Sequence, residues 1–297
     1  MKVETVHPLG PVVMTNEQYH AAPGISKSHL DVIARKSPKH YWEKYLNPDH
    51  EEDPKSRVFM FGQATHTAIL EPETMEDRVV VGLPHDRRSN SNKQAWAEFE
   101  LENFGRIILT RAELDAVMRI VDNVWAEPEI AGLLTGGIAE QSFFAMMDVP
   151  DGEGGLLFDH DTGEIIQSLV KCQPDYRRPG SHIIDLKSTE DASREAFGKS
   201  CANYRYPVQQ AWYTDVLDAC GHYSNEPFLF LCFEKEPPFA IGLYPLEDVA
   251  VSQGRIAYER DFARIVTHKR QNYWPSHFRS IKESITNPLR LPGWMKL

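Results

Sequence analysis

The chain has 297 residues, of which 41% are hydrophobic and 25% charged, and its formal net charge at pH 7 is -11. This composition is typical of a globular protein. The acidic balance excludes a protein that binds DNA through its overall charge, because such affinity comes largely from Lys and Arg neutralising phosphates. Any DNA contact must come from local clusters of basic residues.

The sequence carries no sign of a membrane or secretory protein. No segment approaches the ~18 consecutive apolar residues of a membrane span, and the first ten residues lack the build of a signal peptide. We therefore expect a cytoplasmic protein. No C-x-x-C pair occurs, which argues against a zinc ribbon or an iron–sulfur cluster and predicts reduced, buried thiols. These cysteines are Cys172, Cys201, Cys220 and Cys232.

The first half of the chain is predicted to be mainly helical, from apolar residues at helical spacing and from Ser residues suited to cap helices. Within Phe59–Leu70, the small residues Gly62 and Ala64 are expected to let a neighbouring element approach closely. The predicted helices are Ile25–Leu46, divided at Ser37-Pro38, then Phe59–Leu70, Lys93–Phe104 and Arg111–Trp125.

After Gly136-Gly137 the pattern becomes that of strands and turns. Three strands of an antiparallel meander are expected at Ala139–Asp148, Ile165–Pro174 and Ser181–Ser188. Further on, helices are predicted from about Ala192, over Pro207–Ala219 and over Leu246–Lys269, and strands over Phe228–Cys232 and Ala240–Tyr244. The order predicts one α/β domain over residues 1–297, with a helical part at about 1–135, a core at about 136–245 and a C-terminal helical part at about 246–297.

An acidic and basic triplet lies on two of these strands. Asp175 follows Pro174 at a strand end, and Asp185 and Lys187 are two residues apart, so they share a face of their strand. Two carboxylates can hold Mg²⁺, and an ammonium group can stabilise the charge that develops at a phosphate. The triplet suits phosphodiester hydrolysis, but a surface salt bridge is an equally simple explanation.

Four further residues are candidates for the same site. Gln209 and Tyr213 are four apart and therefore share a helix face. They could point at a metal site, or be a surface Gln beside a half-buried Tyr. His66 lies on an apolar helix and is either a core residue or a metal ligand. Glu140 could support a ligand or face solvent.

Local positive charge is available in three places, each of which could contact DNA or form a solvated surface. They are His85–Lys93, which includes Arg87 and Arg88, the pair Arg177-Arg178, and Lys199 with Arg205.

Several motifs occur in the order found in one family. They are Y-H-x-x-P-G-I-S-K-S-H-L at Tyr19–Leu30, G-x-A-x-H-x-x-x-L-E-P at Gly62–Pro72, C-Q-P-D at Cys172–Asp175, I-I-D-L-K-S-T at Ile183–Thr189, Y-R-Y-P-V-Q-Q-A-W-Y at Tyr204–Tyr213 and L-P-x-W at Leu291–Trp294. Together they resemble the RecE-type exonucleases (exonuclease VIII), which belong to the RecB-like and lambda-exonuclease-like branch of the PD-(D/E)XK nucleases. The resemblance spans nearly the whole chain.

The resemblance implies a PD-(D/E)XK nuclease core, with a mixed sheet flanked by helices. It makes His66, Asp175 and Asp185 ligands of Mg²⁺, with Mn²⁺ as an alternative, and makes Lys187 the catalytic lysine. Gln209 and Tyr213 would complete the active site. Contacts to DNA are expected from early-helix polar residues and from basic residues. These are Ser26, Lys27, Ser28, Arg87, Arg88 and Arg205.

The resemblance also implies an activity: digestion of one strand of linear double-stranded DNA from the 5′ end, leaving a 3′ overhang. A single-strand annealing protein would be the partner in recombination, the enzyme would form a ring-shaped homo-oligomer, and its origin would be a phage or prophage in a bacterial host. The motifs leave three alternatives open: an endonuclease or repair nuclease with the same site, a catalytically inactive DNA-binding module, and a phage scaffold or interaction protein.

Overall fold

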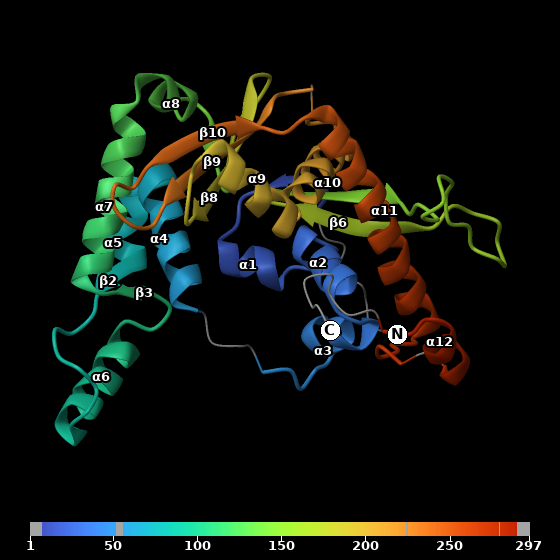
Figure 1. The fold of residues 1–297 in the computed structure, drawn as a ribbon, viewed down its shortest axis with the longest axis horizontal. Coiled ribbons are helices and arrows are strands. Elements are labelled where there is room, and N and C mark those ends of the chain that lie inside the picture. Colours follow the sequence, from blue (N-terminus) through green and yellow to red (C-terminus); the bar gives the residue numbers. More distant parts are fainter. Residues whose placement is uncertain (1–7, 52–55, 224, 279, 290–297) are drawn as a thin grey trace, which may run out of the picture. The chain divides into compact units, whose positions relative to one another are not determined.

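Helices dominate the first part of the chain and a run of strands follows in a computed structural model that describes residues 8–51, 56–223, 225–278 and 280–289 (Figure 1). The chain divides into two compact units. The first combines Met1–Gly24, Asp53–Met147 and Leu169–Arg255, and the second combines Ile25–Glu52, Asp148–Ser168 and Ile256–Leu297. The closing motif at Leu291–Trp294 lies outside the described residues.

The helices predicted from periodicity and capping are present, and the structure adds several short ones. Ser26 and Ser37 cap α2 and α3, and Thr110 begins α7 with a capping box that it forms with Glu113. The helices are α1 (Asn16–Ala21), α2 (Lys27–Arg35), α3 (Pro38–Tyr45), α4 (Arg57–Leu70), α5 (Met75–Arg78), α6 (Asn90–Glu102), α7 (Arg111–Ala126), α8 (Pro128–Leu133), α9 (Arg194–Asn203), α10 (Tyr206–Ala219), α11 (Asp248–Gln271) and α12 (Ile281–Thr286), with a 3₁₀ turn η1 (Pro72–Thr74).

The strands form three sheets in the described residues. The largest has the order β10-β9-β8-β7-β4, the second has the order β1-β5-β6, and β2 and β3 form a parallel pair. The strands are β1 (Gly10–Val12), β2 (Val79–Val81), β3 (Ile107–Leu109), β4 (Ile138–Ala139), β5 (Ser142–Asp148), β6 (Gln167–Cys172), β7 (Tyr176–Arg178), β8 (His182–Thr189), β9 (Phe228–Glu234) and β10 (Ile241–Pro245).

The predicted meander differs from the observed sheets in two ways. Its three strands all form, but hydrogen bonding assigns β5 and β6 to one sheet and β8 to another. The strand expected over Ala139–Asp148 is interrupted, because Glu140 has a positive φ of 49° that no regular strand allows. The chain changes sheet at this residue, between β4 and β5.

The five-stranded sheet is mixed because β8 and β9 run parallel, joined by the crossover helices α9 and α10. Alternate residues of β9 lie on opposite faces. On one face, Leu231 and Phe233 join the core that α4 and α7 bury. On the other, Phe228 contacts Tyr213, and Phe230 stacks on Tyr206 of α10. The sheet is thus covered on both faces, which explains the nearly continuous apolar run of β9.

Within the second unit, α3 contacts the segment after α11. Tyr41 stacks on Trp274 with ring centroids 5.4 Å apart, and the Lys39 N–H donates to the Pro275 carbonyl at 3.0 Å. Arg270 forms an ion pair with Asp159, which lies in the long excursion between β5 and β6. These contacts join all three segments of the unit.

No helix in the described ranges combines the length and the apolar character that a membrane crossing requires. The cysteines form no disulfide. Cys172, Cys201 and Cys232 are buried, as predicted, whereas Cys220 is only half-buried.

Candidate active site

Two strands separate where the predicted acidic residues lie. β7 pairs with β8 only from Tyr176 to Arg178, and its last partner on β8 is Ile184. Asp175 directly precedes β7, and Asp185 directly follows Ile184. Beyond the paired region, the Leu186 N–H donates to Asp175 Oδ2 at 2.6 Å. The Asp175 side chain therefore lies in the opening between the two strands.

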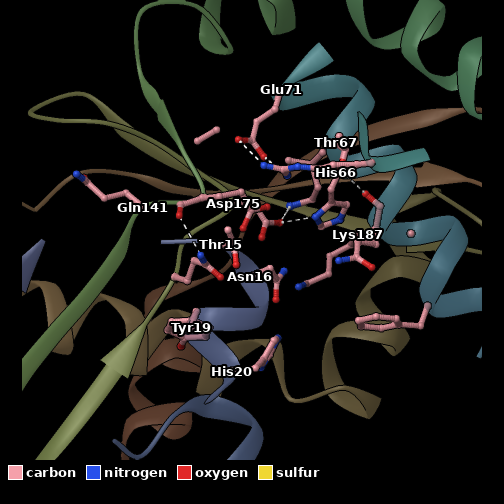
Figure 2. A pocket seen from close by; sticks show the side chains of 18 of the residues that line it. Thr15, Asn16, Tyr19, His20, His66, Thr67, Glu71, Gln141, Asp175 and Lys187 are labelled. Carbon is pink, nitrogen blue, oxygen red and sulfur yellow. Dashed lines mark hydrogen bonds and ion pairs between the residues drawn. The ribbon is translucent and has the colours of Figure 1, made fainter. Parts of the chain in front are cut away.

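Three side chains from separate segments meet at this opening, and Figure 2 shows two of them, His66 and Asp175. His66 of α4, Glu140 between β4 and β5, and Asp175 each offer one ligand atom, and these atoms lie within 4.8 Å of one another. His66 Nδ1 is 3.5 Å from Asp175 Oδ2. One imidazole nitrogen and two carboxylate oxygens form a donor set suited to Mn²⁺ or Mg²⁺.

Glu140 is held in place through its backbone. Its left-handed conformation is unfavourable for a residue with a side chain, so it requires support from its surroundings. The Glu140 N–H donates to the Asp175 carbonyl at 2.9 Å, and Gln173 Nε2 donates to the Glu140 carbonyl at 2.9 Å. Backbone strain held by specific bonds is a frequent property of functional sites, and here it places a carboxylate beside Asp175.

Asp185 is fully buried, and both of its carboxylate oxygens have partners. Gln209 Nε2 of α10 donates to Asp185 Oδ1, and Lys187 forms an ion pair with Asp185 Oδ2. Lys187 Nζ also lies 4.8 Å from the centroid of the Tyr206 ring. Asp185 is not among the three grouped ligand candidates, so its role as a ligand stays a prediction, while Glu140 moves from a secondary to a leading candidate.

The pKa values reflect a concentration of buried negative charge. Burial raises the pKa of Asp175 and of Asp185 to about 6, and for Asp185 the neighbouring Asp175 charge adds to the effect. Burial, followed by the charges of Asp175 and Glu71, raises the pKa of Glu140. Crowding makes the ionised forms of these carboxyl groups unfavourable, and a bound cation would stabilise those ionised forms. The residues present therefore fit a divalent metal.

The two basic groups of the site have opposite shifts. Burial, with the nearby Lys187 charge, lowers the pKa of His66 to about 4, so its imidazole is neutral at pH 7 and able to bind a metal. Burial alone would lower the pKa of Lys187, but the carboxylates of Asp185 and Asp175 outweigh it and raise the pKa above its ordinary value. Lys187 is therefore a fixed positive charge.

Both residues proposed on α10 are within this region. Gln209 is buried rather than on the surface, because it contacts Asp185. Tyr213 lines the same cavity as His66 and Asp175, which has a volume of about 650 Å³. Gln209 and Tyr213 therefore lie in the candidate site, and their part in catalysis stays a prediction.

Other cavity residues were not proposed from the sequence. Arg78 forms a bidentate pair with Glu71, at 2.7 and 3.3 Å, and Tyr206 lies beside Lys187. Glu71 and Tyr206 both belong to motifs quoted above, which was the available signal. Helix α1 also lines the cavity, with its N-cap Thr15 and with Asn16, Tyr19 and His20 (Figure 2).

The basic and polar residues proposed to contact DNA have local partners. In the second unit, Ser26 Oγ lies 3.0 Å from Ser28 Oγ, and Lys27 pairs with Asp31 at 2.7 Å. In the first unit, Arg88 pairs with Asp86 at 3.3 Å, and Arg205 takes a left-handed conformation before α10. Contact of these residues with DNA stays a prediction.

The proposal of Arg177 as surface charge is wrong. Its side chain is 5% exposed and forms a buried ion pair of 2.6 Å with Glu226, which also accepts the Gly180 N–H. The sequence shows no partner for Arg177, because Glu226 lies 49 residues further along the chain. Arg177 therefore stabilises the fold and is not available to DNA.

A mixed sheet with an acidic residue at the end of one strand and D-x-K on the next, where the two strands separate, defines the PDDEXK-like nuclease fold. The chain belongs to the family described as the PDDEXK-like domain of unknown function DUF3799, whose model matches residues 26–282. The predicted fold class is confirmed, and the assignment to RecE-type enzymes remains a finer prediction.

Comparison with solved structures agrees on the fold. A protein from Eubacterium rectale described as "Putative exonuclease" aligns with a TM-score of 0.61 and 15% sequence identity, covering 95% of this chain and 96% of its own. A structure named SSO0001 aligns over 94% of this chain and 98% of its own, at 12% identity and a TM-score of 0.29, which is too low to support an argument. No curated protein matches the sequence.

Proposed function

We propose that this protein is a metal-dependent DNA exonuclease of the RecE type, which digests one strand of linear duplex DNA from 5′ to 3′. The observation that carries the proposal is the meeting of His66, Glu140 and Asp175 beside the Asp185–Lys187 pair. The resemblance of the ordered motifs supports the finer assignment. The description of the Eubacterium rectale protein with the same fold supports the exonuclease activity alone.

The residues have distinct parts in this proposal. His66, Glu140 and Asp175 would hold the cation, and Asp185 is a further predicted ligand. When bound, a divalent metal supplies positive charge at a phosphate and acidifies water. Lys187 would orient the attacking water or offset the negative charge that develops on the phosphate. The Asp185 carboxylate and the Tyr206 ring position Lys187, and Gln209 fixes Asp185.

The test compares linear duplex labelled at one 5′ end with closed circular duplex, in Mg²⁺ or in EDTA. We expect the wild type to digest only the linear DNA and only with metal, releasing the 5′ label first. Lys187→Ala and Asp185→Ala should lower the single-turnover rate by ~100-fold or more, as loss of transition-state charge stabilisation does.

Each part of the proposal has an outcome that contradicts it. Digestion of the circular DNA would indicate an endonuclease or repair nuclease. Early release of a 3′ label would reverse the polarity. A wild type that binds DNA but never cuts would be an inactive binding module.

We further propose a ring-shaped homo-oligomer, a single-strand annealing partner and a phage or prophage origin, which rest on the family resemblance, and a cytoplasmic location, which rests on the sequence pattern described above. The mass of the protein in solution tests the ring, and a monomer at working concentration would contradict it.

A further inference from the structure

A second cavity, of about 890 Å³, lies in the first unit beside the β2–β3 pair, α6, and the first turns of α4 and α7. Its size is within the range of small-molecule sites. Four arginines line it, against a single acidic residue, Glu100, in a chain whose net charge is -11. The arginines are Arg57, Arg87, Arg106 and Arg111.

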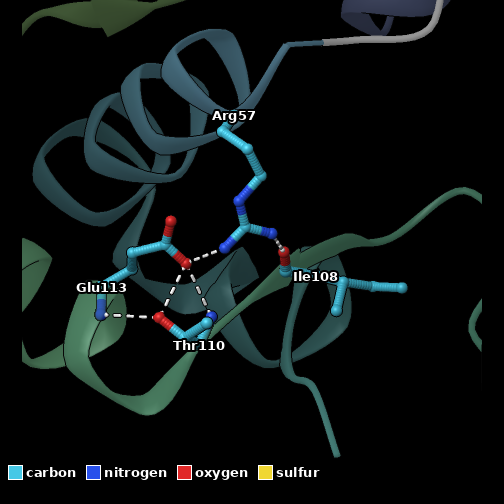
Figure 3. A network of polar contacts seen from close by, with 4 residues as sticks. All are labelled: Arg57, Ile108, Thr110 and Glu113. Atoms are coloured by element: carbon cyan, nitrogen blue, oxygen red, sulfur yellow. Dashed lines mark hydrogen bonds and ion pairs between the residues drawn. The ribbon is translucent and has the colours of Figure 1, made fainter. Parts of the chain in front are cut away.

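Two of the four arginines are neutralised by carboxylates. Arg57 forms an ion pair with Glu113 and donates to the Ile108 carbonyl at 3.2 Å, while Glu113 also accepts from Thr110 (Figure 3). Arg87 pairs with Glu100 at 2.6 Å. These pairs fix the wall of the cavity and leave the other two arginines as its excess positive charge.

Arg106 and Arg111 have no carboxylate partner in the described part of the chain. Arg106 donates only to neutral oxygens, including Asn103 Oδ1 and the Val79 carbonyl, each at 2.9 Å. Its Nε is buried and has no hydrogen-bond partner among the described residues. No carboxylate in the described ranges offsets the Arg106 charge, so the arrangement favours an anion in the cavity that does.

Trp96 provides an aromatic wall next to this charge. Its Nε1 donates to the His85 carbonyl at 2.8 Å, and the Arg87 guanidinium lies 4.2 Å from the ring centroid. Gly82 allows this position of the indole, because a Cβ at Gly82 would lie only 2.6 Å from it. The indole is therefore held at its nitrogen by His85 and at one ring face by Arg87.

We propose that this cavity binds a nucleotide of a single DNA strand, with the base against Trp96 and the phosphate at Arg106 and Arg111. Aromatic stacking combined with Arg–phosphate contacts is how proteins hold single strands without reading sequence. The inference rests on the proposed nuclease function, of which it names a second DNA-binding site.

The position of the cavity favours a continuous strand over a free nucleotide. Arg57 and Met60 of α4 line this cavity, whereas Ser56 and Phe59, at the same end of the helix, line the cavity of the candidate active site. From Arg57 to His66 the helix rises ~14 Å. That is the length of ~4 base-pair steps, so one strand can reach both cavities.

The test measures binding of a fluorescein-labelled thymidine oligonucleotide in EDTA, by anisotropy, so that no cleavage is involved. Arg111→Ala should weaken binding by ~5-fold or more. Arg119→Ala is the matched control: Arg119 is an exposed arginine of the same helix that does not line the cavity, and its loss should change the affinity by less than ~2-fold. Trp96→Ala should weaken binding by ~5-fold or more, and Trp96→Phe should restore most of it.

Equal losses for Arg111→Ala and Arg119→Ala would overturn the proposal, because they would show only a general charge effect. If thymidine monophosphate competed as strongly as the unlabelled oligonucleotide, the proposal that the cavity binds a continuous strand would be overturned. The nuclease assay is separate: an inert enzyme whose oligonucleotide binding depends on Arg111 refutes the proposed function alone. If the enzyme is active but its affinity for the oligonucleotide is unchanged in Arg111→Ala and Trp96→Ala, this inference alone is refuted.

Discussion

Glu140 and Asp175 reach the same opening by different physical means. Asp175 is placed by a strand end and by its bond from the Leu186 amide, whereas Glu140 is placed by a strained backbone that two long-range hydrogen bonds hold. Both bonds are formed by the backbone of Glu140 and neither by its carboxylate. The charge of the carboxylate can therefore be removed without loss of either bond.

We therefore expect Glu140→Gln to fold normally and to lose metal affinity. The Mn²⁺ dissociation constant, from titration calorimetry, should rise by ~10- to 100-fold, the range typical of groups that support a metal site. Glu129→Gln, at an exposed position on α8, is the control and should bind Mn²⁺ as the wild type does. Unchanged affinity in Glu140→Gln would remove this residue from the proposed ligand set.

The raised pKa values of Asp175 and Asp185, about 6 against 3.8, predict a pH-dependent effect of metal on stability. Without metal, the folded protein holds these protons more tightly than the unfolded chain. Their favourable contribution is complete below about pH 4 and is lost as the pH rises through 6. Metal binding requires the ionised forms, so Mn²⁺ should raise the melting temperature more at pH 7 than at pH 5. Equal increases at both pH values would contradict this.

At the scale of elements, two helical glycines have opposite environments. The backbone of Pro207 at the start of α10 lies against Gly254 of α11, and a Cβ there would lie 2.3 Å from the Pro207 carbonyl oxygen. A Cβ at Gly62 of α4 would meet nothing within 4 Å. The expectation of close packing at Gly62 was thus wrong, because this residue faces the candidate active-site cavity, and the close approach occurs at Gly254 instead.

We expect Gly254→Ala to lower the free energy of unfolding by ~1–3 kcal/mol, since the backbone of α10 must shift. Gly62→Ala should raise it by ~0.5–1 kcal/mol, because Ala loses less conformational freedom in a helix. Urea denaturation of both variants measures the difference. A neutral Gly254→Ala would mean that the two helices can separate without cost.

The elements that could be predicted are those whose pattern is local. Periodicity and capping predicted α2, α3, α4 and α7 nearly to the residue, and alternation placed Asp185 and Lys187 on one face of β8. The elements that were missed include short strands without such a local pattern. β1 pairs with β5, which lies more than 120 residues away, and β7 is the short charged segment Tyr176–Arg178.

The same distinction applies to the candidate site. Asp175, Asp185 and Lys187 were visible as a spacing, and so were Gln209 and Tyr213 on one helix face. The family resemblance then gave roles to these two residues and to His66. The importance of Glu140 could not be seen in the sequence. It follows from a positive φ that the Asp175 carbonyl and Gln173 stabilise. No local propensity predicts that conformation for a glutamate.

At the scale of the whole molecule, an acidic chain must bind an acidic polymer through limited basic surfaces. We expect digestion of linear duplex to slow by ~10-fold or more between 50 and 200 mM salt, because each phosphate contact releases counterions. The rate under subsaturating DNA, measured at fixed Mg²⁺ over that range, tests this. A rate independent of salt would mean that contacts to neutral groups dominate.

The amide of Leu186 bonds directly to Asp175, one of the three grouped ligand candidates. The environment of the Leu186 amide proton therefore depends on the charge of the Asp175 carboxylate. Its NMR chemical shift should move when the Asp175 carboxylate gains a proton or a diamagnetic Mg²⁺, in the absence of DNA and of any turnover. Occupancy of the candidate centre could then be followed in a catalytically silent protein.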